Sequence, residues 1–109
     1  MKTTARGGVA CGELLRPLTR GAIVELVWWD SIGRHGWTPA SEIDQWAEEV
    51  SGADHRSAGY FFAVTDHTVT LVQSMADYDG DDHQVDHILA IPLVAVRQAR
   101  VLRAGPRPT

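Results

Sequence analysis

The chain lacks the features on which disulfide-linked, membrane-spanning and dinucleotide-binding proteins depend. It has one cysteine, Cys11, so no intrachain disulfide can form, which is typical of proteins of the reducing cytoplasm. Its longest apolar runs, FFAV and AIPLVAV, are far shorter than the roughly 18 residues that predict a membrane-spanning helix. It has no glycine-rich phosphate loop and no dinucleotide-binding motif. We therefore expect a cytoplasmic domain that holds no cofactor and contacts no membrane.

Basic residues are scarce in the middle of the chain. Residues 21–96 carry thirteen acidic residues against Arg34 and Arg56, a net charge of −11. Residues 1–20 carry four basic residues against one acidic residue, and residues 97–109 carry four arginines. Because nucleic-acid binding depends on neutralising phosphates with Lys and Arg, the acidic middle opposes it, and only the two ends suit a polyanion.

The periodic patterns are confined to residues 21–103, which we predict to be the folded domain. Residues 1–20 contain glycine interruptions and a proline but no sustained period, which predicts a flexible basic N-terminal arm. Residues 104–109 are predicted to be a C-terminal tail. A chain of this length supports one domain with one modest core.

Strand periodicity begins near the start of the predicted domain. Val24, Leu26 and Trp28 fall on one side of a period of two, which predicts the first strand. The same alternation predicts a hairpin around an Asp66–His67 turn, a strand that ends at Pro92, and a last basic strand with the sequence VRQARVLR. The intervening LVAV fits a single tight turn.

Between the first two strands the period changes to that of a helix. Four apolar residues follow the spacing i, i+3, i+4 and i+7 and so share one helical face, namely Ile43, Trp46, Ala47 and Val50. Thr38 suits the N-cap and Pro39 suits the first helical position. We predict a helix over residues 39–50 whose outer face is acidic.

Together these elements predict a mainly β protein, a small five-stranded SH3-like or Sm-like barrel with one helix inserted between strands 1 and 2. A sheet this small buries one face best by curling, and closure into a barrel removes exposed strand edges. The short proline-led turn before the last strand is typical of the connection that crosses the mouth of such barrels.

A pattern of aromatic, glycine and proline residues runs through residues 22–102 as W-x-D-S, then G-W, G-Y, a strand ending in Ser, and I-P. The residues that carry it are Trp28, Asp30, Ser31, Gly36, Trp37, Gly59, Tyr60, Ser74, Ile91 and Pro92. This pattern resembles that of a family of small uncharacterised phage and prophage proteins with a predicted barrel. The resemblance implies the SH3-like or Sm-like fold and a phage or actinobacterial prophage setting, and it implies no reaction. It carries nothing over to the basic arm or to Trp29, where the chain departs from the pattern.

The aromatic residues around the first strand have two interpretations. In one, Trp28 belongs to the core and Asp30 ends the strand by accepting backbone N–H bonds. In the other, Trp29, Trp37 and Tyr60 stay partly exposed and form an aromatic surface for a flat or cationic ligand or for a protein partner.

The arginines of the last strand also have two interpretations. They can clamp a phosphate or carboxylate, or they can neutralise the acidic middle of the chain. The candidate ligand-binding or partner-binding residues are therefore Trp29, Asp30, Trp37, Tyr60, Arg97 and Arg100.

Three other clusters do not predict chemistry. The trio Asp30, Ser31 and His35 offers a nucleophile and a base, but closeness in sequence supplies neither their contact nor an oxyanion hole. The HQVDH stretch, residues 83–87, has metal-like spacing but falls on a loop and a strand rather than on a helix. The DYDGDD stretch, residues 77–82, places its glycine fourth, where a calcium-binding loop needs it sixth. We expect no metal site and no enzyme.

Two functions from different classes remain. The first is a small interaction module that associates with copies of itself and presents its aromatic surface and acidic helix to a host or phage protein. The second is an oligomeric protein that sequesters a nucleotide-like signal of host defence with the same aromatics and arginines. A third, Sm-like nucleic-acid binding, depends on the fold analogy and the basic ends alone.

Overall fold

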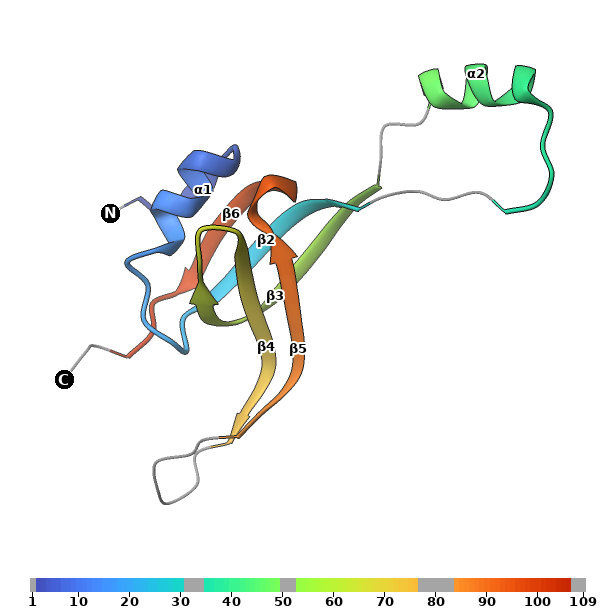
Figure 1. Cartoon of the computed structure of the whole chain (residues 1–109). Coiled ribbons are helices and arrows are strands. Elements are labelled where there is room, and N and C mark those ends of the chain that lie inside the picture. The colour runs from blue at the N-terminus through green and yellow to red at the C-terminus, as the bar shows by residue number, and fades with distance from the viewer. Residues whose placement is uncertain (1, 31–34, 50–52, 77–83, 107–109) are drawn as a thin grey trace.

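The structure is a computed structural model that describes residues 2–30, 35–49, 53–76 and 84–106. Its elements in chain order are β1 (Thr4–Arg6), α1 (Gly8–Leu15), β2 (Ile23–Asp30), α2 (Ala40–Glu49), β3 (Ala53–Val64), β4 (Thr68–Ala76), β5 (Gln84–Pro92), the 3-10 turn η1 (Leu93–Ala95) and β6 (Val96–Arg103). The strands form one antiparallel sheet in the order β1-β6-β2-β3-β4-β5. Figure 1 shows α1 beside β6 and β2, whereas α2 stands apart beyond the ends of β2 and β3.

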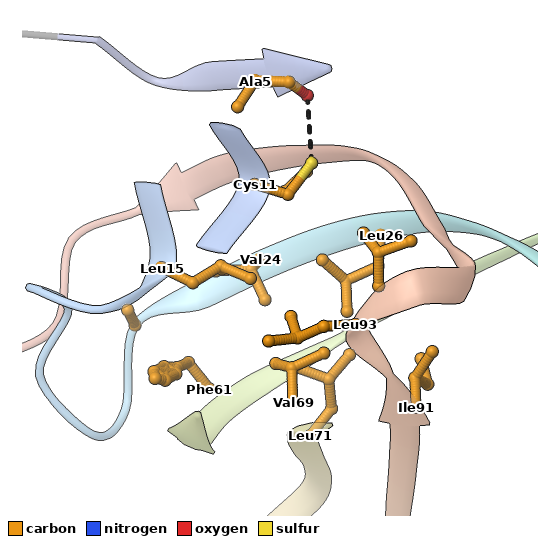
Figure 2. Packing of buried hydrophobic residues seen from close by; sticks show 13 residues of the cluster. Ala5, Cys11, Leu15, Val24, Leu26, Phe61, Val69, Leu71, Ile91 and Leu93 are labelled. Carbon is orange, nitrogen blue, oxygen red and sulfur yellow. Dashed lines mark hydrogen bonds between the residues drawn. The ribbon is translucent and has the colours of Figure 1, made fainter. Parts of the chain in front are cut away.

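The core lies on one face of the sheet, under α1 and η1. Its centre is β2, whose alternate residues Val24 and Leu26 are fully buried, as a period of two requires. Cys11 and Leu15 of α1 pack onto this face together with Leu93 of η1 (Figure 2). The other members of this core are Ala5, Ala22, Phe61, Val69, Leu71, Ile91, Val96 and Ala99.

The expectation of a flexible N-terminal arm is wrong for most of residues 1–20. Residues 4–6 pair with β6 as β1, and Gly7, with a φ of 85°, turns the chain into α1. Glycine inside a helix costs about 1 kcal/mol relative to alanine, which is why GVACGELL does not resemble a helix in sequence. Tertiary packing overrides that cost, because Cys11 and Leu15, one turn apart, both reach the core.

The C-terminal tail is also partly anchored. The Thr19 hydroxyl donates a hydrogen bond to the Pro106 carbonyl at 2.8 Å. A Cβ at Gly105 would lie 2.5 Å from the Thr19 hydroxyl oxygen, so only glycine permits this approach. Residues 104–106 therefore lie against the loop before β2, and residues 107–109 lie outside the described residues.

The mainly β class is confirmed, but the barrel is not. The sheet has six strands instead of five because β1 joins β6, and within the described residues it is open, with β1 and β5 as its edges. The helix lies between the first two predicted strands as expected, and its described part is Ala40–Glu49. The single turn before the last strand is present as η1.

The N-cap expected at Thr38 is not formed. Its hydroxyl donates to the Gly36 carbonyl at 3.3 Å, and the helix begins at Ala40, which places Pro39 before the first helical residue. The Glu42 amide donates to the Pro39 carbonyl at 3.0 Å, so Pro39 closes the first turn through its backbone.

Cys11 is a core residue rather than a reactive thiol. Its Sγ donates to the Ala5 carbonyl at 3.5 Å, a bond drawn in Figure 2, and its side chain is fully buried. Burial raises the pKa of the Cys11 thiol above its ordinary value, and a backbone hydrogen bond from Ala99 offsets only part of this effect. The thiol therefore stays protonated and shielded at neutral pH.

Replacing Leu15 with alanine tests whether the N-terminal segment is part of the core. We expect Leu15→Ala to reduce the free energy of unfolding by about 2–5 kcal/mol, because a fully buried leucine leaves a cavity. Val9→Ala on the exposed side of the same helix should change it by less than about 0.5 kcal/mol. Urea unfolding at a fixed protein concentration measures both values, and equal small effects would mean that α1 is not docked.

Alkylation of Cys11 gives a second test of the same packing. At pH 8, N-ethylmaleimide should modify the native thiol at least about 100-fold more slowly than the unfolded chain, since reaction requires local opening of the core. Val9→Cys in a Cys11→Ala background places a thiol on the exposed side of α1 and should react at nearly the unfolded rate. Fast modification of native Cys11 would contradict the buried placement.

Candidate interaction surface

Trp29 and Arg97, two of the predicted site residues, lie together on the face of the sheet opposite the core. The Arg97 guanidinium lies 4.7 Å from the centroid of the Trp29 ring, and its Nη1 is 3.5 Å from Asp54 Oδ1. Trp29 and Asp54 are direct neighbours across β2 and β3, which explains the grouping. Trp29 remains 45% exposed, but Arg97 covers one face of its ring and Asp54 balances the charge of Arg97.

On the core-side face of the same two strands, Asp30 belongs to a second polar group. Trp28 stacks on His55 with ring centroids 5.0 Å apart, and its indole Nε1 donates to the Ser57 hydroxyl at 3.1 Å. His55 Nε2 lies 3.5 Å from Asp30 Oδ2. Trp28 therefore packs at the edge of the core, as the first interpretation of the tryptophans expects, while Trp29 lies on the outer face.

Arg100 lies in a third group, centred on Glu25 of β2. Glu25 Oε1 accepts a hydrogen bond from Arg56 Nη1 at 2.9 Å and lies 3.8 Å from Arg100 Nη2. The Glu25 side chain is only 15% exposed, so the two arginines enclose it. Arg97 and Arg100 thus each lie beside a carboxylate of this chain, as the charge-neutralising interpretation predicts.

Trp29, Trp37 and Tyr60 are not brought together. Tyr60 is opposite Ile23 of β2, six residues from Trp29, which is about 20 Å along a strand. Trp37 lies in the segment that leads into α2 and is fully exposed. The structure therefore groups four of the candidates with polar or charged neighbours, namely Trp29, Asp30, Arg97 and Arg100, and forms no continuous aromatic surface from Trp29, Trp37 and Tyr60.

The structure describes only part of the motifs that we rejected from the sequence. Ser31, residues 77–82 and His83 lie outside the described residues, while His35 is exposed. His87 lies on β5 with its Nδ1 3.3 Å from Asp86 Oδ2. Among the described residues no group of three or more His, Cys, Asp or Glu side chains is arranged to hold a metal ion.

The first feature that the sequence did not reveal is that α2 stands apart from the sheet and from α1. Ile43 and Trp46 keep the predicted helical face, yet in the described structure no strand and no other helix packs along it (Figure 1). The chain is correspondingly extended, with a radius of gyration of 17.4 Å and a longest dimension of 60 Å. A compact domain of this length has a radius of gyration of about 13 Å.

A groove between α1 and the end of β6 is the second feature that the sequence did not reveal. It has a volume of about 420 Å³ and is mostly apolar. Its lining residues are Lys2, Thr3, Ala10, Glu13, Leu14, Pro17, Leu18, Val101 and Ala104. The spacing of Ala10, Leu14 and Leu18 at every fourth residue was the available signal, but the glycines around it predicted a coil.

Comparison with family models, with curated proteins and with solved structures found no match to this chain. None of the helices in the described part of the chain combines the length and the apolar character needed to cross a membrane. α2 stands out in the described structure as the helix that no strand or other helix packs against.

A double-mutant cycle tests the Trp29–Arg97 contact. We expect a coupling energy of about 0.5–1 kcal/mol between Trp29→Leu and Arg97→Ala, the usual value for a cation above an exposed aromatic ring. A matched cycle with Arg100→Ala should give additive effects, because Arg100 pairs with Glu25, four residues away from Trp29 on β2. Additivity in both cycles, measured by urea unfolding, would mean that Arg97 does not cover Trp29.

Proposed function

We propose that this protein is a non-enzymatic interaction module that binds another protein chain through the apolar face of α2. The observation that carries the proposal is the position of Ile43 and Trp46, both half-buried, on a helix against which no strand of the described sheet packs. An amphipathic helix of this kind typically lays its apolar residues into a groove of its partner.

The length of α2 supports the same conclusion. α2 has ten residues, and isolated helices shorter than about 12–15 residues are only marginally stable in water. One hydrogen bond inside the helix, from Gln45 Nε2 to Glu49 Oε1 at 2.9 Å, adds little to this. Burial of Ile43 and Trp46 against a partner would supply the stabilisation that the helix lacks alone, because most helical stability in proteins comes from packing of the apolar face.

The charge of α2 restricts the partner. The helix carries Glu42, Asp44, Glu48 and Glu49 and no basic residue, a net charge of −4. Complementary charge raises association rates and selects among partners, so the groove that receives this helix should be apolar with a basic rim.

For the fold, we propose that the sheet is an open variant of the SH3-like or Sm-like architecture. The order β6-β2-β3-β4-β5, with a 3-10 turn before β6 and a helix before β2, supports this assignment. The phage or prophage setting and the location in the host cytoplasm remain predictions that depend on the sequence resemblance.

The alternative of a nucleotide-like ligand receives little support. Such a ligand would stack on Trp29 and pair with the arginines of β6, but Arg97 already lies over that ring and beside Asp54. Arg100 lies beside the enclosed Glu25. A ligand would have to displace contacts that are already made, at a cost in binding free energy.

Hydrogen exchange tests whether α2 is available for binding. In dilute protein, near 1 µM, we expect the amides of residues 43–49 to be protected less than about 10-fold, since an unpacked helix opens freely. Amides of β2, between β3 and β6, should be protected at least about 1,000-fold and serve as the internal control.

Two outcomes would contradict the proposal. Strong protection of α2 in dilute monomer would show that its own chain covers the helix, which is then not a binding element. A rise in Tm with cyclic nucleotides or ADP-ribose derivatives would favour the alternative, because a ligand at 100 times its dissociation constant stabilises by about 2.7 kcal/mol.

A further inference from the structure

The partner of α2 can be deduced from the rest of this chain. We infer that α2 of one copy docks into the groove between α1 and β6 of a second copy. This inference rests on the proposed function and names the partner of that same helix.

The groove has the shape and surface that the helix needs. It is open, mostly apolar and about 420 Å³ in volume, with Leu14 and Leu18 on one side and Val101 on the other. Ile43 and Trp46, three residues apart on α2, form a compact apolar pair on one face of the helix. Insertion of this pair would cover the apolar surfaces of both helices at once.

Charge at the groove complements the charge of α2. Lys2 lines the groove directly, and Arg103 is the sequence neighbour of the lining residue Ala104, whereas Arg16 lines a separate pocket with Asp66. Glu13 is the acidic residue among the lining residues, and Arg16 also lies 3.6 Å from the exposed Asp66. Lys2 in the groove and Arg103 next to it in the chain are therefore the basic partners available to the four acidic residues of α2.

The position of the two surfaces favours a second copy over the same chain. Val101, which lines the groove, is paired with Val24 of β2. Val24 lies six residues before Asp30, the last residue of β2, so the groove is about 20 Å from that end of the strand. α2 lies beyond that end of β2 and β3, in a molecule 60 Å long (Figure 1). If two copies lie antiparallel, α2 of each copy reaches the groove of the other, and two identical contacts close a symmetric dimer.

Sedimentation from about 1 to about 100 µM tests the inference with two single variants. Trp46→Ser removes the main anchor of the helix, and Ala104→Glu places an acidic side chain at an exposed position in the groove. Each variant should raise the dimer dissociation constant at least about 30-fold. Trp46→Ser removes a central anchor, and Ala104→Glu places a charge of the same sign as α2 at the contact. Neither residue belongs to the buried core, and circular dichroism confirms that each variant is folded.

Mixing the two variants is the decisive measurement. A chain with Trp46→Ser keeps an intact groove, and a chain with Ala104→Glu keeps an intact helix. An equimolar mixture should therefore form a heterodimer with one intact contact under conditions where each variant alone is monomeric. Trp37→Ser and Ala90→Glu make the same chemical changes at exposed positions outside the contact and should leave the dissociation constant within about 3-fold.

The outcomes separate this inference from the proposed function. A monomer throughout the range with unprotected α2 amides overturns the inference and leaves α2 for a different protein. A monomer with protected α2 amides means docking within one chain and overturns both. Three other outcomes overturn the docking of α2 into this groove. The dimer could survive Trp46→Ser, or Trp37→Ser could weaken it as much as Trp46→Ser does. An equimolar mixture of the two variants could also fail to associate.

Discussion

The structure depends on the burial of one face of β2 between the two ends of the chain. Val24 and Leu26 lie at the middle of the sheet, where β2 pairs with β3 on one side and β6 on the other. α1 from the N-terminal side and η1 from the C-terminal side cover this face through Leu15 and Leu93. Because no disulfide can assist a chain with one cysteine, this apolar contact is the main source of stability for the sheet.

α1 and η1 cover only part of the length of β2, and the point where this cover ends determines the shape of the molecule. Beyond Leu26 the core ends at Trp28, and aromatic and charged side chains pair on both faces of the strand. Trp28 stacks on His55 on the core side, and Arg97 covers Trp29 on the other. These contacts hold β2 and β3 together as an arm without adding a second core, so α2 at its end has no surface of its own sheet to pack against.

The strand and helix patterns could be predicted from the sequence because they depend on local periodicity. The β2 alternation, the helical face of Ile43 and Trp46 and the turn after Pro92 are all local signals. Docking of α1 and addition of β1 were not predictable, since both depend on contacts with β6, more than 80 residues away in sequence. For the same reason, periodicity cannot show that Arg97 lies over Trp29, that Tyr60 lies far from it, or that the sheet stays open.

The uneven distribution of acidic and basic residues along the chain can be interpreted once α2 and the groove are located in the structure. The arginines of the sheet pair with carboxylates of the same copy, as Arg97 does with Asp54. The four acidic residues of α2 have no basic residue on their own helix, whereas Lys2 lies in the groove formed by the chain ends. Opposite charges on separate surfaces attract between molecules, whereas the mixed charges typical of a monomer surface largely cancel. On the proposed function, the apolar pair on α2 supplies affinity and the surrounding charges supply orientation. The groove exists only because α1 docks on β6, so the contact that stabilises the sheet would also create the surface that receives the helix.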